Sequence, residues 1–321
     1  MDWHDGGALV VISSIDVGTN TVLLLVARFD DSGLITPLAF EQRIPRLGFG
    51  VDASRRLARE PMQRALAVLR DYRTILETYR PDATVVFGTS ALRDASNREE
   101  FRQLVRDEAG FDLEVLSGAD EALWTYRGAV SGLGPIGRAV VLDIGGGSTE
   151  LASGAGGALN RRASLDVGSV RLTERFFRHD PPLQDELRRA RALLQSELSP
   201  VISALDGSST LVGVAGTVTS LAILAQGLPR FAVDAVAGYR MSRATVGRLF
   251  DRLSGMPARE IRQLSEIMEG RADVITAGAL ILQEVMDSCC FPDVVVSERG
   301  VRYGVAIREW EKARAGSSRG G

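Results

Sequence analysis

Two segments combine an aspartate with a glycine turn after an apolar run, and they are the first candidates for chemistry. They are Asp16-Val17-Gly18-Thr19-Asn20-Thr21 and Asp143-Ile144-Gly145-Gly146-Gly147-Ser148-Thr149-Glu150. An aspartate at the end of a buried strand places its carboxylate at a sheet edge, and adjacent glycines let backbone N–H groups close around an anion. Three consecutive glycines favour function over a simple turn, because each costs backbone entropy. The first segment alone could be a tight turn, but the pair predicts a phosphate site with a metal anchor.

A strand-to-helix turn and an arginine could extend this phosphate site. Residues 211–217 pass from strand to helix through small residues, so the helix start at Gly216 and Thr217 presents free N–H groups and a partial positive charge. Arg93 lies one turn into a helical stretch after Gly88-Thr89-Ser90. Its guanidinium suits a pair of phosphate oxygens. A surface salt bridge to Asp94 or Glu99 is the alternative for this side chain.

The segment Ser117-Gly118-Ala119-Asp120-Glu121 has the pattern of a capping box. Ser117 would be the N-cap, and Asp120, three residues on, would complete the cap. Glu121 is not needed for capping, so its carboxylate is free to project into a cleft between domains.

The composition excludes several other chemistries. The chain has two cysteines, Cys289 and Cys290, and two histidines, too few for a disulfide framework, a four-thiolate zinc site or a histidine-rich metal site. The single lysine, Lys312, leaves no P-loop motif. A net charge of −3 lacks the basic excess of a duplex nucleic-acid binder. The remaining Asp, Glu, Ser, Thr, Asn, Arg and 34 glycines suit Mg²⁺ and phosphate.

The hydropathy pattern predicts a globular protein without membrane spans. The longest apolar runs fall far short of the ~20 residues needed to cross a bilayer. Residues 1–7 carry Asp2 and Asp5 and no Lys or Arg, unlike an export signal. We therefore expect no membrane partner and a cytoplasmic location.

The expected elements form two similar series, each beginning with a strand meander. The first series has strands at 10–17, 21–28 and 34–43, a helix from about 60 to 80, a strand at 84–87, a helix at 97–109 and an extended segment at 112–116. A Gly/Pro stretch at 132–137 is the expected linker. The second series has strands at 139–143, 148–152, 158–165, 211–214 and 294–296, with helices at 183–202, 217–225, 243–253, 258–264 and 272–286 and a final helix.

This repetition predicts an α/β fold of two related domains that face one another across a ligand. The expected division is residues 1–131 with 304–321 in one domain, and 132–303 in the other.

The motifs together resemble the exopolyphosphatase and guanosine pentaphosphate phosphohydrolase family of the actin, sugar-kinase and chaperone ATPase superfamily. The resemblance spans about residues 13–306. It rests on the segments described above and on the motif Arg271-Ala272-Asp273-Val274-Ile275. It implies two actin-like (ribonuclease H-like) domains, each a mixed sheet with a β-meander and flanking helices, with the active-site cleft between them.

The resemblance also implies roles for residues. Glu121 corresponds to the catalytic base, assisted by Glu150, while Asp143 and Asp16 would hold Mg²⁺ or Mn²⁺. Phosphate binding is expected at Gly18, Thr19, Asn20, Arg93, Gly145, Gly146, Gly147, Ser148, Gly216 and Thr217. Asp120 stands where the family often has a second glutamate. The chain stops near where longer members begin an extra helical domain, so we expect a preference for short chains.

The expected reaction is Mg²⁺-dependent hydrolysis of terminal phosphoanhydride bonds in inorganic polyphosphate, guanosine pentaphosphate, or both. A sensor that binds guanosine tetra- or pentaphosphate or polyphosphate without turnover is one alternative. A kinase or ATPase of the same superfamily is another. The sequence leaves open whether the protein forms a homodimer.

Overall fold

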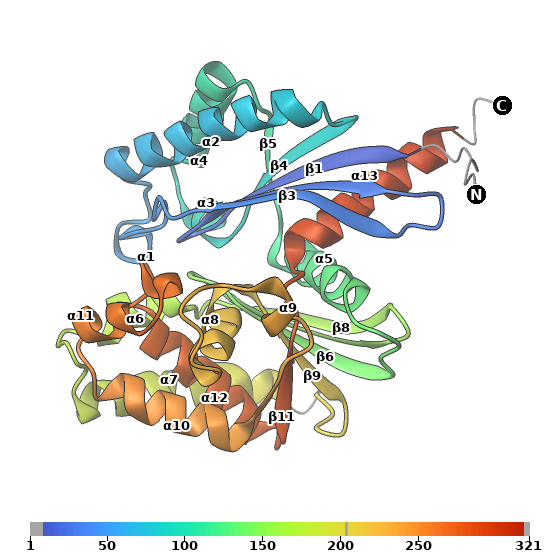
Figure 1. The fold of residues 1–321 in the computed structure, drawn as a ribbon. Helices are drawn as coiled ribbons and strands as arrows, with labels where there is room; N and C mark the ends of the chain where they lie inside the picture. Colours follow the sequence, from blue (N-terminus) through green and yellow to red (C-terminus); the bar gives the residue numbers. More distant parts are fainter. Residues whose placement is uncertain (1–8, 203–204, 318–321) are drawn as a thin grey trace.

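The computed structural model describes residues 9–202 and 205–317 and contains two lobes, each built on a mixed β-sheet (Figure 1). In the first lobe, β1 (Val10–Val17), β2 (Val22–Phe29) and β3 (Ile35–Arg43) form an antiparallel meander. β4 (Ala83–Gly88) pairs parallel with β1, and β5 (Leu113–Val115) pairs parallel with β4. The strand order is therefore β3-β2-β1-β4-β5.

The second lobe repeats this plan with one strand more. β6 (Arg138–Ile144), β7 (Thr149–Ala155) and β8 (Ala158–Leu165) form its meander. β9 (Thr210–Val214) and β11 (Asp293–Val296) run parallel to β6 in the order β10-β11-β9-β6-β7-β8. The sequence did not predict β10 (Arg240–Ser242), which pairs antiparallel with β11 and buries only Met241. The predicted two-lobed α/β fold with paired meanders is confirmed.

Helices cover the sheets where their apolar stripes predict it. α2 (Arg59–Tyr79) buries Leu66, Leu69 and Tyr72 against the first sheet's core. The predicted helix 97–109 divides into α4 (Arg98–Leu104) and a π-helical turn (Val105–Ala109). The helical stretch expected around Arg93 is α3 (Ser90–Asp94). The sequence did not predict the short helix α1 (Val51–Ser54).

The second lobe carries most of the remaining helices. Its long helices are α7 (Gln184–Ile202), α8 (Ala215–Ala225), α10 (Arg243–Ser254) and α12 (Ile275–Ser288). Its shorter ones are α9 (Val233–Val236), α11 (Ala258–Ile261) and two 3₁₀ turns (Arg262–Leu264 and Glu266–Met268). The sequence did not predict α6 (Ser169–Phe176), which follows β8 and borders the cleft.

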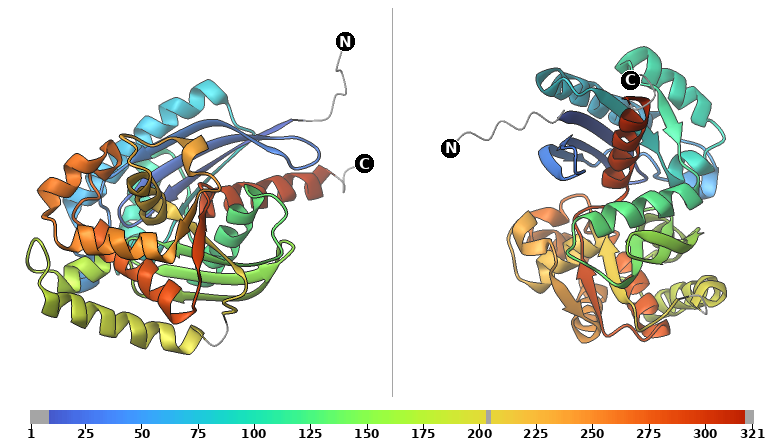
Figure 2. Two further views of the ribbon diagram at one scale, coloured as in Figure 1. Left: turned by 60° about the horizontal axis from the view of Figure 1, so that its bottom comes forward. Right: turned by 90° about the vertical axis from the view of Figure 1, so that its right-hand side faces the viewer.

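Two helices cross between the lobes and pack on each other, α13 in red beside α5 in green (Figure 2). α5 (Gly118–Ser131) follows the first sheet but packs on β6, β7 and β8, while α13 (Val301–Ser317) follows the second sheet and packs on β1, β2 and β4. Glycines allow the close approach, because a Cβ on Gly304 would lie 1.8 Å from the carbonyl oxygen of Trp124. The division into one domain of residues 1–131 with 304–321 and another of residues 132–303 stays a prediction. The helix α5, which this division gives to the first domain, contacts the second sheet.

Within residues 9–202 and 205–317, no helix combines the length and apolar character needed to cross a membrane.

Candidate active site

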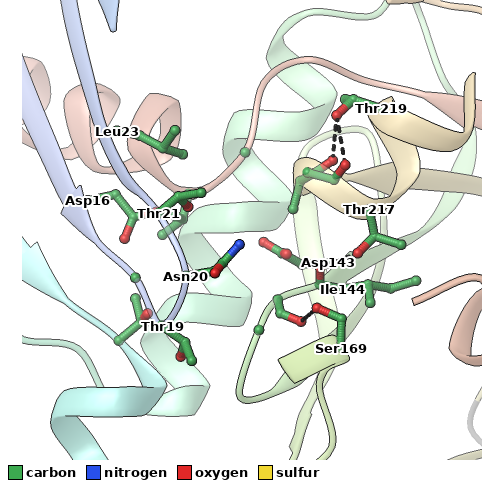
Figure 3. A pocket seen from close by; sticks show the side chains of 18 of the residues that line it. Asp16, Thr19, Asn20, Thr21, Leu23, Asp143, Ile144, Ser169, Thr217 and Thr219 are labelled. Atoms are coloured by element: carbon green, nitrogen blue, oxygen red, sulfur yellow. Dashed lines mark hydrogen bonds between the residues drawn. The ribbon is translucent and has the colours of Figure 1, made fainter. Parts of the chain in front are cut away.

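The two aspartate-glycine segments face one another across a cleft of about 320 Å³ between the lobes. Figure 3 shows Asp16, Thr19 and Asn20 on one side and Asp143, Ser169 and Thr217 on the other. Most predicted site residues line this cleft, as the resemblance implied, namely Asp16, Gly18, Thr19, Asn20, Glu121, Asp143, Gly145, Gly146, Gly147, Ser148, Gly216 and Thr217. Arg93 and Glu150 do not line the cleft, but Arg93 contacts the lining residues Glu121 and Ser148, and Glu150 is paired with the lining residue Asp143 in the β6–β7 ladder.

The turns of the two hairpins have the same geometry. In the first, the N–H of Gly18 donates to the carbonyl of Thr21 at 2.9 Å, and in the second the N–H of Gly145 donates to the carbonyl of Ser148 at 3.0 Å. A Cβ on either glycine would lie 3.0 Å from that same carbonyl oxygen. The internal repeat expected from the sequence is thus present at the level of single hydrogen bonds.

In the second hairpin, residues of α6 donate hydrogen bonds to the carbonyl groups of the glycine loop. The N–H groups of Ser169 and Val170 donate to the carbonyls of Gly145 and Gly146, each at 2.9 Å, and Arg171 Nε donates to Gly147 at 2.7 Å. Within the described chain, the N–H groups of Gly146 and Gly147 have no protein acceptor. A loop whose carbonyls are bound on one side leaves its N–H groups for an anion on the other.

The first hairpin is supported in the same way by the loop that follows β3. The N–H of Gly48 donates to the carbonyl of Thr19 at 2.8 Å, and the N–H of Arg46 donates to Asn20 at 3.1 Å. The N–H groups of Thr19 and Asn20 likewise have no acceptor among the residues that the structure describes. Both lobes therefore present backbone N–H groups beside their aspartates.

The start of α8 forms a third wall of the cleft. Ala215 adopts a left-handed conformation with φ of 66°, and Thr217 Oγ1 donates to the carbonyl of Ile144 at 3.3 Å. Gly216 is needed here for space, because a Cβ would lie 1.6 Å from Nη1 of Arg271. The first N–H groups of α8 lack intrahelical partners, so this helix start adds positive potential.

Four buried carboxylates converge near the cleft, and their pKa values are all raised. Burial is the main cause for each, and mutual repulsion adds to it for Asp16, Asp143 and Glu150. The pKa of Asp143 rises to about 7, although Thr125 Oγ1 donates to it at 3.4 Å. Asp16 Oδ1 and Glu150 Oε2 are buried without a hydrogen-bond partner among the described residues. A cation bound among these carboxylates would favour their charged forms.

The donor set fits a magnesium ion that phosphates and water help to ligate. The described residues contain no group of three or more His, Cys, Asp or Glu side chains placed to hold a metal by themselves. Mg²⁺ prefers oxygen and is usually held by one or two carboxylates together with substrate phosphates and water. Asp16 and Asp143 would supply one carboxylate from each lobe, and the unpartnered Asp16 Oδ1 is a free ligand atom.

The guanidinium of Arg93 contacts buried carboxylates and not the acids at the surface that could have paired with it. It forms an ion pair with Glu121, donates to Ser148 Oγ at 3.2 Å and lies 3.8 Å from Glu150 Oε1. The alternative salt bridges do not form, because Asp94 pairs with Arg171 and Glu99 with Arg102. Arg93 therefore orients the side chain of Glu121. The backbone N–H of Glu121 donates to the carbonyl of Ser117 at 2.9 Å. The predicted cap itself is confirmed, since Ser117 Oγ accepts from the N–H of Asp120 at 3.1 Å.

The sequence analysis gave no site role to three charged residues of the cleft, although the first of them, Arg271, begins one of the motifs that carry the resemblance. Arg271 is buried, donates to Gln42 Oε1 at 2.9 Å, and burial lowers its pKa to about 10. Arg302 lies near Asp16 and Asp143, and burial lowers its pKa. Glu298 lines the cleft beside it. For Glu298 and Arg302 the available signal was their position two residues before and two residues after Gly300, shortly after the apolar strand that ends at Val296.

Comparisons with known proteins agree with this geometry. The model of the Ppx/GppA phosphatase family matches residues 25–313. Exopolyphosphatase 2 of Mycobacterium tuberculosis is 36% identical over 315 residues, covering 94% of this chain and 98% of that protein. The crystal structure of the Aquifex aeolicus member of the Ppx/GppA family is 31% identical with a TM-score of 0.81, over 95% of this chain and 99% of that one.

An exopolyphosphatase from Cytophaga hutchinsonii is 29% identical with a TM-score of 0.85, over 92% of this chain and 96% of that one. The two-lobed α/β fold expected from the resemblance is shared with these relatives. With its paired hairpins, buried carboxylates and matching length, the chain belongs to the Ppx/GppA phosphatase family.

Proposed function

We propose that this chain hydrolyses terminal phosphoanhydride bonds and releases orthophosphate from inorganic polyphosphate. One observation carries the proposal. Glu121 is buried at the start of α5, is held by Arg93, and lines the cleft between two hairpins that present free N–H groups. Hydrolysis of a terminal phosphoryl group needs such an arrangement, with the phosphates fixed and a base beside the attacking water.

The backbone N–H groups of the two hairpins and of α8 would bind the phosphate oxygens. They come from Thr19, Asn20, Gly146, Gly147, Ser148, Gly216 and Thr217. Gly18 and Gly145, whose own N–H groups close the two turns, would contribute to phosphate binding by shaping the loops. Arg93 keeps its predicted role on phosphate within this proposal, and its ion pair with Glu121 would let it orient the base as well. Fixed donors stabilise developing negative charge without reorganisation.

Glu121 would position the attacking water and accept its proton. Burial raises the pKa of this carboxyl above its usual range, which brings a carboxylate closer to the value of an effective base near neutral pH. Glu150, 3.8 Å from Arg93, would assist as a second carboxylate. The proton would pass from the water to a carboxylate oxygen of Glu121.

Asp143 and Asp16 would hold Mg²⁺ or Mn²⁺ between the lobes. When bound, the ion neutralises charge that spreads over the transferring phosphoryl oxygens. The unpartnered Asp16 Oδ1 supports this assignment.

Guanosine pentaphosphate is a second candidate substrate, and one part of the cleft favours it. Phe40 from β3, Phe231 from the loop before α9, and Ile267 are apolar side chains that line the cleft. A polyphosphate chain has no apolar surface to bury there, whereas a nucleobase stacks on aromatic rings.

A phosphate-release panel tests the proposal. Tripolyphosphate, long-chain polyphosphate, guanosine pentaphosphate and ATP are incubated with Mg²⁺, with and without a sugar acceptor. We expect release from tripolyphosphate without an acceptor. Tight binding with no release from any substrate indicates a sensor, and strict dependence on the acceptor indicates a kinase. A cytoplasmic location and a homodimer stay predictions.

A further inference from the structure

Arg171 on α6 connects the glycine loop of the second lobe to two carboxylates of the first. Its side chain is only 5% exposed. Nε donates to the carbonyl of Gly147 at 2.7 Å, Nη1 donates to Asp52 at 2.8 Å, and Nη2 pairs with Asp94. Nη2 also lies 3.4 Å from Ser90 Oγ. All three guanidinium nitrogens are therefore used, and two of them reach across the cleft.

The first-lobe end of this connection is next to the proposed base. Asp94 is the last residue of α3, and its neighbour Arg93 forms the ion pair with Glu121. The short helix α3 thus links Arg171 on one side to Glu121 on the other. The same Arg93 donates to Ser148 Oγ, one residue beyond Gly147.

We propose that Arg171 is a positioning residue that couples closure of the lobes to the shape of the glycine loop. It holds the carbonyl of Gly147 away from the substrate only while Asp52 and Asp94 are in place. The free N–H groups of Gly146 and Gly147 then point to the phosphates when the first lobe, which carries Asp52 and Asp94, is docked. This inference rests on the proposed hydrolysis, because the loop and Glu121 act on the same phosphate chain.

The chemistry of arginine explains why this residue suits the task. A planar guanidinium donates in fixed directions, so one side chain can bind a carbonyl and two carboxylates at once. The two partly buried acids compensate its charge. Loss of the arginine would remove the one side chain that joins Asp52, Asp94 and the glycine loop, although Asp52 would keep its pair with Arg175 and Asp94 its pair with Arg55. A lysine keeps the charge but offers one flexible ammonium group, which cannot reproduce the three contacts.

The same helix offers a matched control. Arg175, one turn further along α6, also pairs with Asp52, at 2.6 and 2.7 Å. Its side chain is 34% exposed and does not contact Gly147 or Asp94. Arg175→Gln therefore removes an ion pair between the lobes and leaves the glycine loop untouched.

Steady-state phosphate release from tripolyphosphate gives the first test. We expect Arg171→Gln to lower kcat about 10²-fold, the size of effect that a small misplacement of reacting groups produces, with a smaller change in KM. Arg171→Lys is expected to fold, because it keeps the charge, and still to lose most of kcat. Arg175→Gln is expected to keep both constants near wild type, since Arg175 does not contact the glycine loop and Asp52 keeps its pair with Arg171. Equal effects of Arg171→Gln and Arg175→Gln, or wild-type kcat in Arg171→Lys, would overturn the proposal.

Amide hydrogen exchange gives a second test that does not depend on turnover. The peptide covering residues 144–149 should exchange faster in Arg171→Lys than in wild type, and at the wild-type rate in Arg175→Gln. Unchanged exchange in Arg171→Lys contradicts the proposal even if kcat falls. If wild-type protein releases no phosphate from any substrate, the proposed hydrolysis fails, while the exchange result still decides whether Arg171 shapes the loop.

Discussion

Glu150 lies directly opposite Asp143 in the antiparallel pairing of β6 with β7. The equivalent residue of the first hairpin, opposite Asp16 in the pairing of β1 with β2, is Leu23. The two hairpins therefore share a turn and an aspartate but differ in the second carboxylate. We infer that both lobes bind phosphate and metal in the same manner, while only the second contributes an additional acid beside the attacking water.

Replacement of the proposed base gives the most direct prediction. Glu121→Gln keeps the shape of the side chain and removes its ability to accept a proton. We expect turnover of tripolyphosphate to fall about 10²–10⁴-fold, the usual contribution of a general base. Initial rates of phosphate release measure this, with circular dichroism and thermal melting to verify the fold.

Asp120→Asn is the matched control for that substitution. Asp120 lies in the same turn of α5, and its contact is with the Ser117 hydroxyl at 2.7 Å. The amide keeps an acceptor for the cap, so we expect wild-type turnover. Wild-type turnover in Glu121→Gln would remove Glu121 from the mechanism.

The hairpins were predictable because their signal is local. Asp16 and Gly18, like Asp143 and Gly145, are close in the chain. An acidic residue before a glycine turn is by itself a signal for a phosphate site with a metal anchor. Arg171 had no such signal, because its partner Asp52 is 119 residues away and its guanidinium is one of many in a chain with 38 Lys and Arg residues. Contacts of that kind follow from how the lobes pack, which no short segment of sequence encodes.

The predicted fold was right in outline and less accurate where tertiary packing decides. Strands with buried apolar runs, such as β1 and β6, begin and end close to the predicted residues. α6 escaped prediction because its eight residues are flanked by the cleft on one side and by exposed loop residues on the other. Eight residues are also fewer than the window of about 11–18 residues over which a helical period is recognised, and the hydrogen bonds of α6 to the carbonyls of the glycine loop leave no signal in the sequence.

The close contact between α5 and α13 predicts a loss of stability in Gly304→Ala. The added Cβ would lie 1.8 Å from the Trp124 carbonyl oxygen, which belongs to backbone and cannot rotate away. We expect the free energy of unfolding to fall by about 1–3 kcal/mol, as overpacked sites do. Urea denaturation measures it, and Gly134→Ala serves as the control because no atom lies within 4 Å of its added Cβ. Equal midpoints for both variants would rule out the close helix contact.

The raised pKa of Asp143 predicts how the stability of the metal-free protein depends on pH. Folding moves this pKa from 3.8 to about 7, chiefly through burial. The folded state therefore binds the proton more tightly than the unfolded state between these values, and stability falls as pH rises through that window. Melting temperatures in EDTA at pH 5 and pH 7.5 measure the change. Asp143→Asn removes this titration, so its decline over the same range should be smaller than that of wild type; a decline as steep as that of wild type contradicts the assignment.

The apolar wall of the cleft predicts that Phe231 distinguishes between two substrates. Phe231 is 36% exposed and lines the cleft, and no ion pair or hydrogen bond involves its ring. Phe231→Ala should raise KM for guanosine pentaphosphate about tenfold, within the range for loss of one base-stacking contact. KM for tripolyphosphate, which has no base, should stay at the wild-type value. Parallel titrations of both substrates with the same preparation measure the two constants, and an equal change in both would mean that this ring shapes the phosphate site rather than a base-binding site.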